Sequence, residues 1–352
     1  MSRGDVERGP MTDAGPDLSE PLMVLSSKPG GRQVGFVVKD RRGVRYLLKF
    51  DRRGVPVAET AANLVVNRLL WAVGYRVPED SIVHLRRSDL AIAPDATIAG
   101  FAGRKVALTR ADLDAALARV NIAKDGTIRA LASRFLPGKP LGGFAQQGTR
   151  DDDPNDRIPH EQRRELRGMY VFYSWLKSTD MKTDNTLDMW EENSPGRGIV
   201  HHYLLDFGMS LGVNGLAVRT RGDGYERFFS ITEVLKRSLT FGLWGWGFET
   251  LPRPRLPHVG VLESEGYRPE QYKTRVHYMP WKSRDRFDTF WAAKRLAQIE
   301  RQHIEGAVAA ARYPDPRSAQ YVVDALVARR QIALRHYFAK VAPTDDFEVA
   351  GG

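Results

Sequence analysis

The sequence of 352 residues predicts an α+β fold with two lobes, a small β-rich lobe followed by a larger, mainly helical one. Runs rich in β-branched and aromatic residues gather before residue 137, whereas apolar residues at helical spacing dominate after residue 160. An apolar content of 42% is sufficient for a substantial core. We expect the β-rich lobe over residues 22–137 and the helical lobe, with a helical C-terminal extension, over 138–345. Residues 1–21 have few large apolar side chains and are expected to form a disordered leader.

Within the first lobe, two predicted elements carry charged side chains that a binding site could use. The strand Arg45–Phe50 contains Lys49, and the amphipathic helix that follows, Ala58–Trp71, has Glu59 in its first turn. We expect Lys49 and Glu59 to form an ion pair, although the helix dipole alone also favours an acid in a first turn. The other elements expected here are two strands, a capped helix and a last strand: Ser81–Leu85, Leu90–Ala93, Thr109–Arg119 and Ile128–Phe135.

A glycine-containing hairpin is expected between residues 26 and 38, with Gly30 and Gly31 directly after Pro29. Glycine allows a backbone to approach a ligand closely, and its N–H groups can then bind phosphate. A Pro-Gly-Gly sequence is also typical of an ordinary turn. The hairpin is therefore a candidate phosphate-binding loop without a specific motif.

The second lobe begins with a predicted amphipathic helix over His160–Lys177, and further helices are expected over Ile231–Phe241, Arg286–Arg312 and Ser318–Lys340. Aromatic residues alternate with glycine over Phe241–Phe248. Large aromatic side chains mostly bury area, so we expect core packing there, with a platform for a planar substrate as the alternative.

Two short motifs point to a specific chemistry. Residues 180–185 have the pattern Asp-x-Lys-x-x-Asn, with Asp180, Lys182 and Asn185 at its fixed positions, and residues 206–208 are Asp-Phe-Gly, beginning with Asp206. Two predicted strands joined by a turn separate the motifs. Alternatively, Asp-Phe-Gly is only a turn at the end of a buried strand. The order and spacing match those of a kinase catalytic loop followed by its metal-binding aspartate.

On these motifs the chain, over about Ser26–Gly208, resembles the protein-kinase-like superfamily, and its atypical bacterial HipA-type and CotH-type branches in particular. The resemblance implies a two-lobed kinase fold that uses ATP and Mg²⁺. It further implies that Lys49 holds the α- and β-phosphates, that Asp180 orients or deprotonates the acceptor, and that Lys182 steadies the transferring group.

The same resemblance implies that Asn185 and Asp206 bind Mg²⁺. It also implies that the segment after residue 135 is the hinge that binds adenine, with Leu136 nearest the contact.

The sequence departs from the family pattern in two places. Ser178-Thr179 replace the His-Arg that usually precedes the catalytic aspartate, and no Ala-Pro-Glu follows Gly208. The departures argue against regulation by activation-loop phosphorylation, and they leave the acceptor open.

We therefore expect a phosphotransferase acting on a hydroxyl of an unidentified protein or small molecule. Transfer of AMP from ATP by the same residues, a nucleotide-binding module without catalysis, and a structural interaction protein are the alternatives. Only the aromatic–glycine run and the basic charge favour the last of these.

Composition narrows the partners and the location. The formal charge of +10 is spread over scattered arginine pairs with acids between them, so nucleic-acid binding is not expected. No cysteine is present, which excludes disulfides and thiolate metal sites. No signal peptide and no apolar run long enough to span a bilayer is evident, and we expect a cytoplasmic protein.

Overall fold

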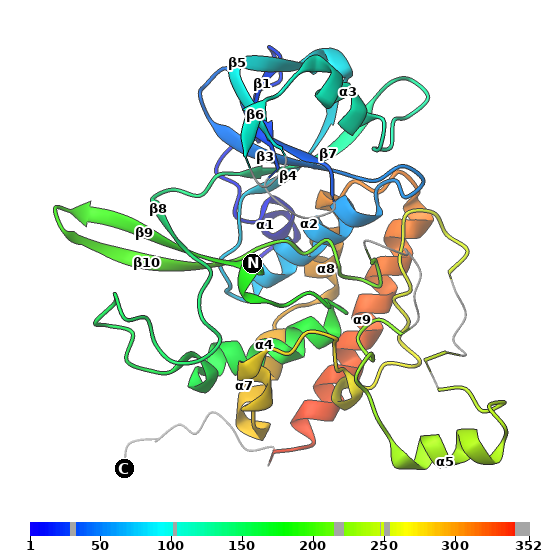
Figure 1. Cartoon of the computed structure of the whole chain (residues 1–352). Helices are drawn as coiled ribbons and strands as arrows, with labels where there is room; N and C mark the ends of the chain where they lie inside the picture. The colour runs from blue at the N-terminus through cyan, green and yellow to red at the C-terminus, as the bar shows by residue number, and fades with distance from the viewer. Residues whose placement is uncertain (29–32, 101–103, 215–221, 247, 250–253, 342–352) are drawn as a thin grey trace.

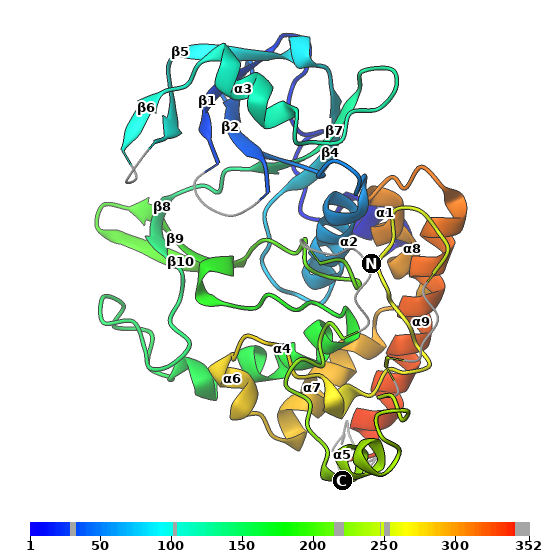
Figure 2. The same cartoon turned by 45° about the vertical axis from the view of Figure 1, so that its right-hand side comes forward.

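The fold is known from a computed structural model, which describes residues 1–28, 33–100, 104–214, 222–246, 248–249 and 254–341. Figures 1 and 2 show a β-rich lobe stacked on a helical lobe, with the chain passing from one to the other after residue 134. The two-lobed α+β architecture predicted from the sequence is therefore confirmed.

The sheet of the first lobe has the strand order β4-β7-β3-β2-β1-β5-β6 in the described part of the chain. Neighbouring strands are antiparallel except for β1 and β5, which run parallel. This arrangement places β3, the strand that carries Lys49, in the middle of the sheet. The strand bounds are β1 (Leu22–Ser27), β2 (Gly35–Lys39), β3 (Arg45–Phe50), β4 (Asp80–Leu85), β5 (Leu90–Ala99), β6 (Lys105–Ala107) and β7 (Ile128–Arg134).

A second, smaller sheet lies at the junction of the lobes and contains β8 (Lys139–Gly142), β9 (Thr186–Ser194) and β10 (Arg197–Leu204). β9 and β10 form an antiparallel hairpin that projects from the body of the molecule in Figure 1. This hairpin is the strand pair expected between the two motifs, and that prediction is confirmed. Its base brings the end of the first motif next to the start of the second.

Each predicted helix is present, although one of them is divided, and two short helices at Arg3–Arg8 and Met279–Lys282 were not predicted. The stretch expected as one helix over 286–312 is two helices, because the chain turns at residues 298–300 and redirects the second helix toward the N-terminal lobe. The helix bounds are α1 (Arg3–Arg8), α2 (Ala58–Ala72), α3 (Arg110–Leu117), α4 (Arg164–Trp175), α5 (Ile231–Leu239), α6 (Met279–Lys282), α7 (Arg286–Ala297), α8 (Arg301–Ala310) and α9 (Pro316–Phe338).

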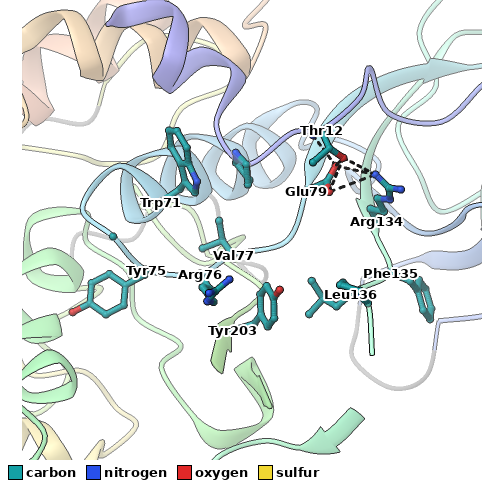
Figure 3. Close-up of a pocket in the computed structure, with 13 residues that line it drawn as sticks. Thr12, Trp71, Tyr75, Arg76, Val77, Glu79, Arg134, Phe135, Leu136 and Tyr203 are labelled. Carbon is teal, nitrogen blue, oxygen red and sulfur yellow. Dashed lines mark hydrogen bonds and ion pairs between the residues drawn. The ribbon is translucent and has the colours of Figure 1, made fainter. Parts of the chain in front are cut away.

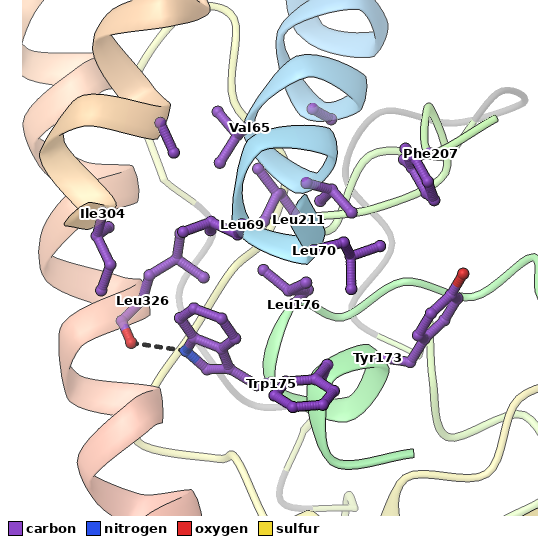
Figure 4. Packing of buried hydrophobic residues seen from close by; sticks show 14 of the residues in the cluster. Val65, Leu69, Leu70, Tyr173, Trp175, Leu176, Phe207, Leu211, Ile304 and Leu326 are labelled. Carbon is purple, nitrogen blue, oxygen red and sulfur yellow. Dashed lines mark hydrogen bonds between the residues drawn. The ribbon is translucent and has the colours of Figure 1, made fainter. Parts of the chain in front are cut away.

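Two hydrophobic clusters form the interior, and α2 belongs to the cluster of the helical lobe. Apolar side chains of α2, such as Val65 and Leu69, pack with residues of α4, α8 and α9, whereas most buried side chains of the sheet form a second cluster with α3. Figure 4 shows this contact, with Trp175 of α4 donating its indole N–H to the carbonyl oxygen of Leu326, 2.9 Å away. The helix that carries Glu59 is thus fixed to the helical lobe.

The expectation of a disordered leader is wrong for its first residues, which form α1. This helix is closed by a capping box, and Val6 is fully buried in the core of the helical lobe. The backbones of α1 and α8 lie so close together that position 306 of α8 must be glycine, because a Cβ there would lie 2.3 Å from the carbonyl oxygen of Arg3. Composition alone did not reveal the segment because its order depends on burial against α8 and α2.

The prediction that the aromatic–glycine run packs in the core is also wrong for the residues described. Phe241 is 96% exposed and Leu243 is 92% exposed, and the apolar side chains of α5 likewise face outward. Trp246 and Phe248 stack on each other and line a cavity of about 640 Å³ at the surface.

Within the described residues, no helix is both long and apolar enough to cross a membrane.

Candidate active site

The site is built around an ion pair between the two lobes. Lys49 extends from β3, and its Nζ lies 3.0 Å from Oδ1 of Asp206, the residue that opens the Asp-Phe-Gly motif after β10. Glu59, the partner expected from the sequence, instead contacts Arg52, with 3.7 Å between the nearest atoms. The expected pairing of Lys49 with Glu59 is therefore corrected: the aspartate after the hairpin holds the lysine.

The backbone of Asp206 has the left-handed conformation, with φ of 57°. This conformation is uncommon for a residue with a side chain, and it persists only where neighbouring contacts impose it. Leu205 N–H donates to the carbonyl oxygen of Asn185 at 2.8 Å, and Phe207 N–H donates to Oδ1 of Asn63 on α2, also at 2.8 Å. These two hydrogen bonds hold the residues on either side of Asp206 and so aim its carboxylate at Lys49.

The first motif forms a compact loop beside this pair. Nζ of Lys182 lies 2.9 Å from Oδ2 of Asp180. The side-chain amide of Asn185 donates to the same carboxylate at 3.0 Å and to the backbone oxygen of Asp180 at 2.6 Å. Thr179 N–H donates to the carbonyl oxygen of Met209 at 3.0 Å. Together with the Asn185–Leu205 hydrogen bond, this contact brackets both aspartates, so Asp180 and Asp206 are held in one site.

The end of α4 presents this loop to the site. Lys177 adopts a left-handed conformation just after the helix, and its buried ammonium group contacts Glu263 at 3.1 Å and the carbonyl oxygen of Val261 at 2.9 Å. The hydroxyl of Tyr272 donates to the carbonyl oxygen of Ser178. The loop of residues 180–185 is therefore anchored by a segment that follows the site in sequence, and no local pattern in the loop itself reveals these contacts.

Charges in the site favour an ionised carboxylate at Asp206. Loss of solvent alone would raise the pKa of Asp206, but the attraction and hydrogen bond of Lys49, aided by Lys28 and Lys182, bring this pKa below its ordinary value. For Glu59 burial dominates and raises its pKa, and Asp51 and Asp206 add to the effect. Of these two carboxylates, Asp206 is therefore the one that is held ionised.

The side chains present fit a magnesium ion of the kind that nucleotides carry. Mg²⁺ takes oxygen ligands and is usually bound by one or two protein groups together with substrate phosphates and water. The carboxylate of Asp206 and the amide oxygen of Asn185 supply such ligands, and the described residues contain no cluster of three or more acidic or histidine side chains that would form a complete protein cage. The site therefore suits a metal that arrives with a phosphate ligand.

Of the other residues predicted for the nucleotide, Gly30 and Gly31 lie outside the described residues. Leu136 lies directly after β7, in the connection between the lobes. Figure 3 shows it lining a cavity of about 610 Å³ together with Trp71, Val77 and Tyr203. Lys49, Asp180, Asn185 and Asp206 do not line this cavity. The predicted contact between the backbone near Leu136 and adenine stays a prediction.

Sequence reasoning did not identify two residues that the structure brings to the site, Asn63 and Lys28. Asn63 lies in the middle of α2, where its Oδ1 accepts from Phe207 and its Nδ2 donates to Oδ2 of Asp80 at 2.7 Å. A polar amide on the buried side of an apolar helix was the available signal. Lys28 follows β1 at the start of the glycine hairpin, and nothing in its local sequence distinguishes it from a surface lysine.

We expect Asn63→Ala to reduce nucleotide turnover, because Phe207 N–H loses its acceptor and Asp206 loses one of its two backbone anchors. A buried hydrogen-bonding group left unpaired also lowers the free energy of unfolding, by about 1–3 kcal/mol. Urea unfolding and steady-state ATP turnover measure the two effects.

Asn67→Ala is the matched control, since Asn67 also donates to Asp80, at 3.2 Å, but makes no hydrogen bond to the Asp-Phe-Gly segment. Both variants should be destabilised, and only Asn63→Ala should lose turnover under conditions where both remain folded. Equal turnover in the two variants would show that Asn63 does not position Asp206.

Comparison with known proteins gives distant structural likenesses only. No protein-family model and no curated protein matches this sequence. Among solved structures, the proinflammatory kinase CtkA of Helicobacter pylori matches with a TM-score of 0.47 and 10% identity, covering 93% of this chain and 100% of its own. Fam20 from hydra, solved with sugar, matches with a TM-score of 0.44 and 14% identity, covering 97% of this chain and 96% of its own.

A third solved structure, the Rio2 kinase of Chaetomium thermophilum in a complex with ADP, Mg²⁺ and phosphoaspartate, matches with a TM-score of 0.30 and 12% identity. The alignment covers 85% of this chain and 72% of that one. At such scores and identities these likenesses assign no activity, so the function is argued below from the residues of the site.

Proposed function

We propose that this protein is an atypical kinase that transfers the γ-phosphoryl group of ATP to a hydroxyl of a protein or small-molecule acceptor. The observation that carries the proposal is the convergence of Lys49, Asp206 and Asp180. A cation from the β-rich lobe meets a carboxylate from the hairpin end at 3.0 Å, and two backbone hydrogen bonds tie that carboxylate to the loop of Asp180. Phosphoryl transfer requires such positioned charges and little covalent chemistry from the protein.

Each side chain has a role that its position supports. Lys49, buried on β3, would bind the phosphates of ATP, and Asp206 with Asn185 would hold Mg²⁺. Bound Mg²⁺ would neutralise negative charge on the phosphates. Lys182, whose partner is Asp180, is placed to contact the transferring group.

The proposed reaction is a single displacement at phosphorus. The acceptor oxygen forms a bond to the γ-phosphorus while the bond from that phosphorus to the β,γ-bridging oxygen breaks, and ADP leaves with the electron pair. Asp180 accepts the proton of the acceptor hydroxyl. The carboxylate of Asp180 is partly exposed, which leaves it accessible to an acceptor.

Thermal stabilisation by ATP, measured with and without Mg²⁺, tests the nucleotide site, because a ligand that binds only the folded state raises the unfolding midpoint. At ATP concentrations about 100 times the dissociation constant the gain is about 2.7 kcal/mol. We expect a shift that requires both ATP and Mg²⁺. Absence of any shift would contradict the proposed site.

Analysis of products by mass then tests the reaction. Phosphoryl transfer produces ADP and an acceptor heavier by a phosphoryl group, whereas nucleotidyl transfer produces pyrophosphate and an acceptor that carries AMP. Binding of ATP with neither product, across a panel of protein and small-molecule hydroxyl acceptors, would instead favour a nucleotide-binding module without catalysis. Assignment to the HipA-type or CotH-type branch is part of this proposal and depends on which acceptor is found.

A further inference from the structure

Lys28 lies in a cross-strand row with Lys49, on the face of the sheet that borders the site. The ladder between β1 and β2 continues past Ser27, because Lys28 N–H donates to the carbonyl oxygen of Gly35 at 2.8 Å. Gly35 is in turn the register partner of Lys49 on β3. Residues directly opposite each other in antiparallel strands point to the same face. The side chains of Lys28 and Lys49 therefore project on the same side, with Gly35 between them.

The missing side chain at Gly35 leaves room for the stem of Lys28. A Cβ at this position would lie 2.5 Å from the carbonyl oxygen of Leu48, which no other residue could tolerate without a shift of the backbone. The same position lies 3.2 Å from Cβ and 3.3 Å from Cδ of Lys28. The stem of Lys28 thus leans over β2 toward β3, and its ammonium group extends toward the site.

The positive charge of Lys28 has no counterion in the described part of the chain. Within it, no carboxylate lies within ion-pair distance of Lys28, whereas Lys49 and Lys182 are each paired with an aspartate of the site. Burial lowers the pKa of Lys28, and the nearby charge of Lys49 lowers it further, while the attraction of Asp206 opposes both effects. Lys28 is thus a half-buried cation that Asp206 attracts but does not pair with in the described part of the chain.

We propose that Lys28 is a second phosphate-binding cation, which binds the phosphate chain of the nucleotide together with Lys49. The inference rests on the proposed function, because it names a further contact of the same nucleotide. It also gives the glycine hairpin a specific charged group, which the glycine residues alone do not provide. Lys28 would contact the phosphates and not adenine, so its substitution should weaken binding of ATP but not of adenosine.

Dissociation constants of ATP with Mg²⁺ and of adenosine, measured by calorimetry on wild type, Lys28→Ala and Lys28→Arg, test this role of Lys28. We expect Lys28→Ala to bind ATP about 10-fold more weakly or worse, which corresponds to the loss of one hydrogen bond to a charged group. Adenosine should bind with unchanged affinity, and Lys28→Arg should recover most of the affinity for ATP. The unfolding midpoint without ligand should not fall.

Lys39→Ala is the matched control, since Lys39 is an exposed lysine at the other end of β2, and it should bind ATP as wild type does. Undiminished ATP affinity in Lys28→Ala, or an equal loss for ATP and adenosine, would overturn this role of Lys28 while leaving the proposed function intact. Failure of the wild-type protein to bind ATP at all would overturn the proposed function and the role of Lys28 with it.

Discussion

Asp206→Asn should abolish magnesium-dependent binding and turnover of ATP. The variant removes the negative charge that pairs with Lys49 and that would bind the metal, and asparagine tolerates the left-handed backbone found at this position. The change therefore tests charge and not loop shape. Turnover should fall by about 10²–10³-fold, the range seen when one preorganised electrostatic group is removed from an active site.

The measurement combines steady-state ATP turnover with the thermal shift produced by ATP and Mg²⁺. Asp184→Asn serves as the control, because Asp184 is an exposed carboxylate in the neighbouring loop, between Lys182 and Asn185. Asp184→Asn should behave as wild type. A magnesium-dependent shift of undiminished size in Asp206→Asn would contradict the assignment of the metal to Asp206.

Asp180→Asn should leave ATP binding almost unchanged and remove phosphoryl transfer. Asparagine retains an oxygen that can accept the hydrogen bonds from Asn185 and Lys182, so the loop should keep its shape. The amide cannot accept the proton of the acceptor hydroxyl, however. Loss of a general base typically lowers the rate by about 10²–10⁴-fold, and we expect a loss within this range.

Calorimetric ATP affinity and the rate of product formation separate the two aspartates. Asp206→Asn should lose both quantities, whereas Asp180→Asn should lose only the rate. An equal loss of ATP affinity in the two variants would show that both aspartates serve the nucleotide or the metal, and that the base must be sought elsewhere.

The comparison of sequence with structure is clearest at the lysine of β3. The strand Arg45–Phe50 and its lysine were predicted with the observed bounds, because a short run of aromatic and aliphatic residues is a local pattern. The partner was predicted wrongly, since Glu59 lies close in sequence and Asp206 does not. Which carboxylate reaches Lys49 depends on how the hairpin β9–β10 and the helix α2 sit against the sheet, and no local pattern records this.

The other differences between prediction and structure arise because burial depends on segments that are distant in sequence. Val6 gave no sign of order in its own segment, because its contacts come from a helix near the other end of the chain. Phe241 and Leu243 were expected in the core because of their size, yet the body of the helical lobe is already filled by α4, α7, α8 and α9. Side-chain type indicates a tendency to be buried, and only the packing determines whether space is available.

The two motifs of the candidate site could be predicted from the sequence. Asp180, Lys182, Asn185 and Asp206 were identified because spacing within a loop, and a strand pair between two loops, are local properties of the chain. The tertiary structure alone decided how these groups are paired, through the Lys49–Asp206 contact and the support of Asn63 from α2. The physical reason is that ion pairs and buried hydrogen bonds act over a few ångströms, so they form between elements that folding brings together from distant parts of the sequence.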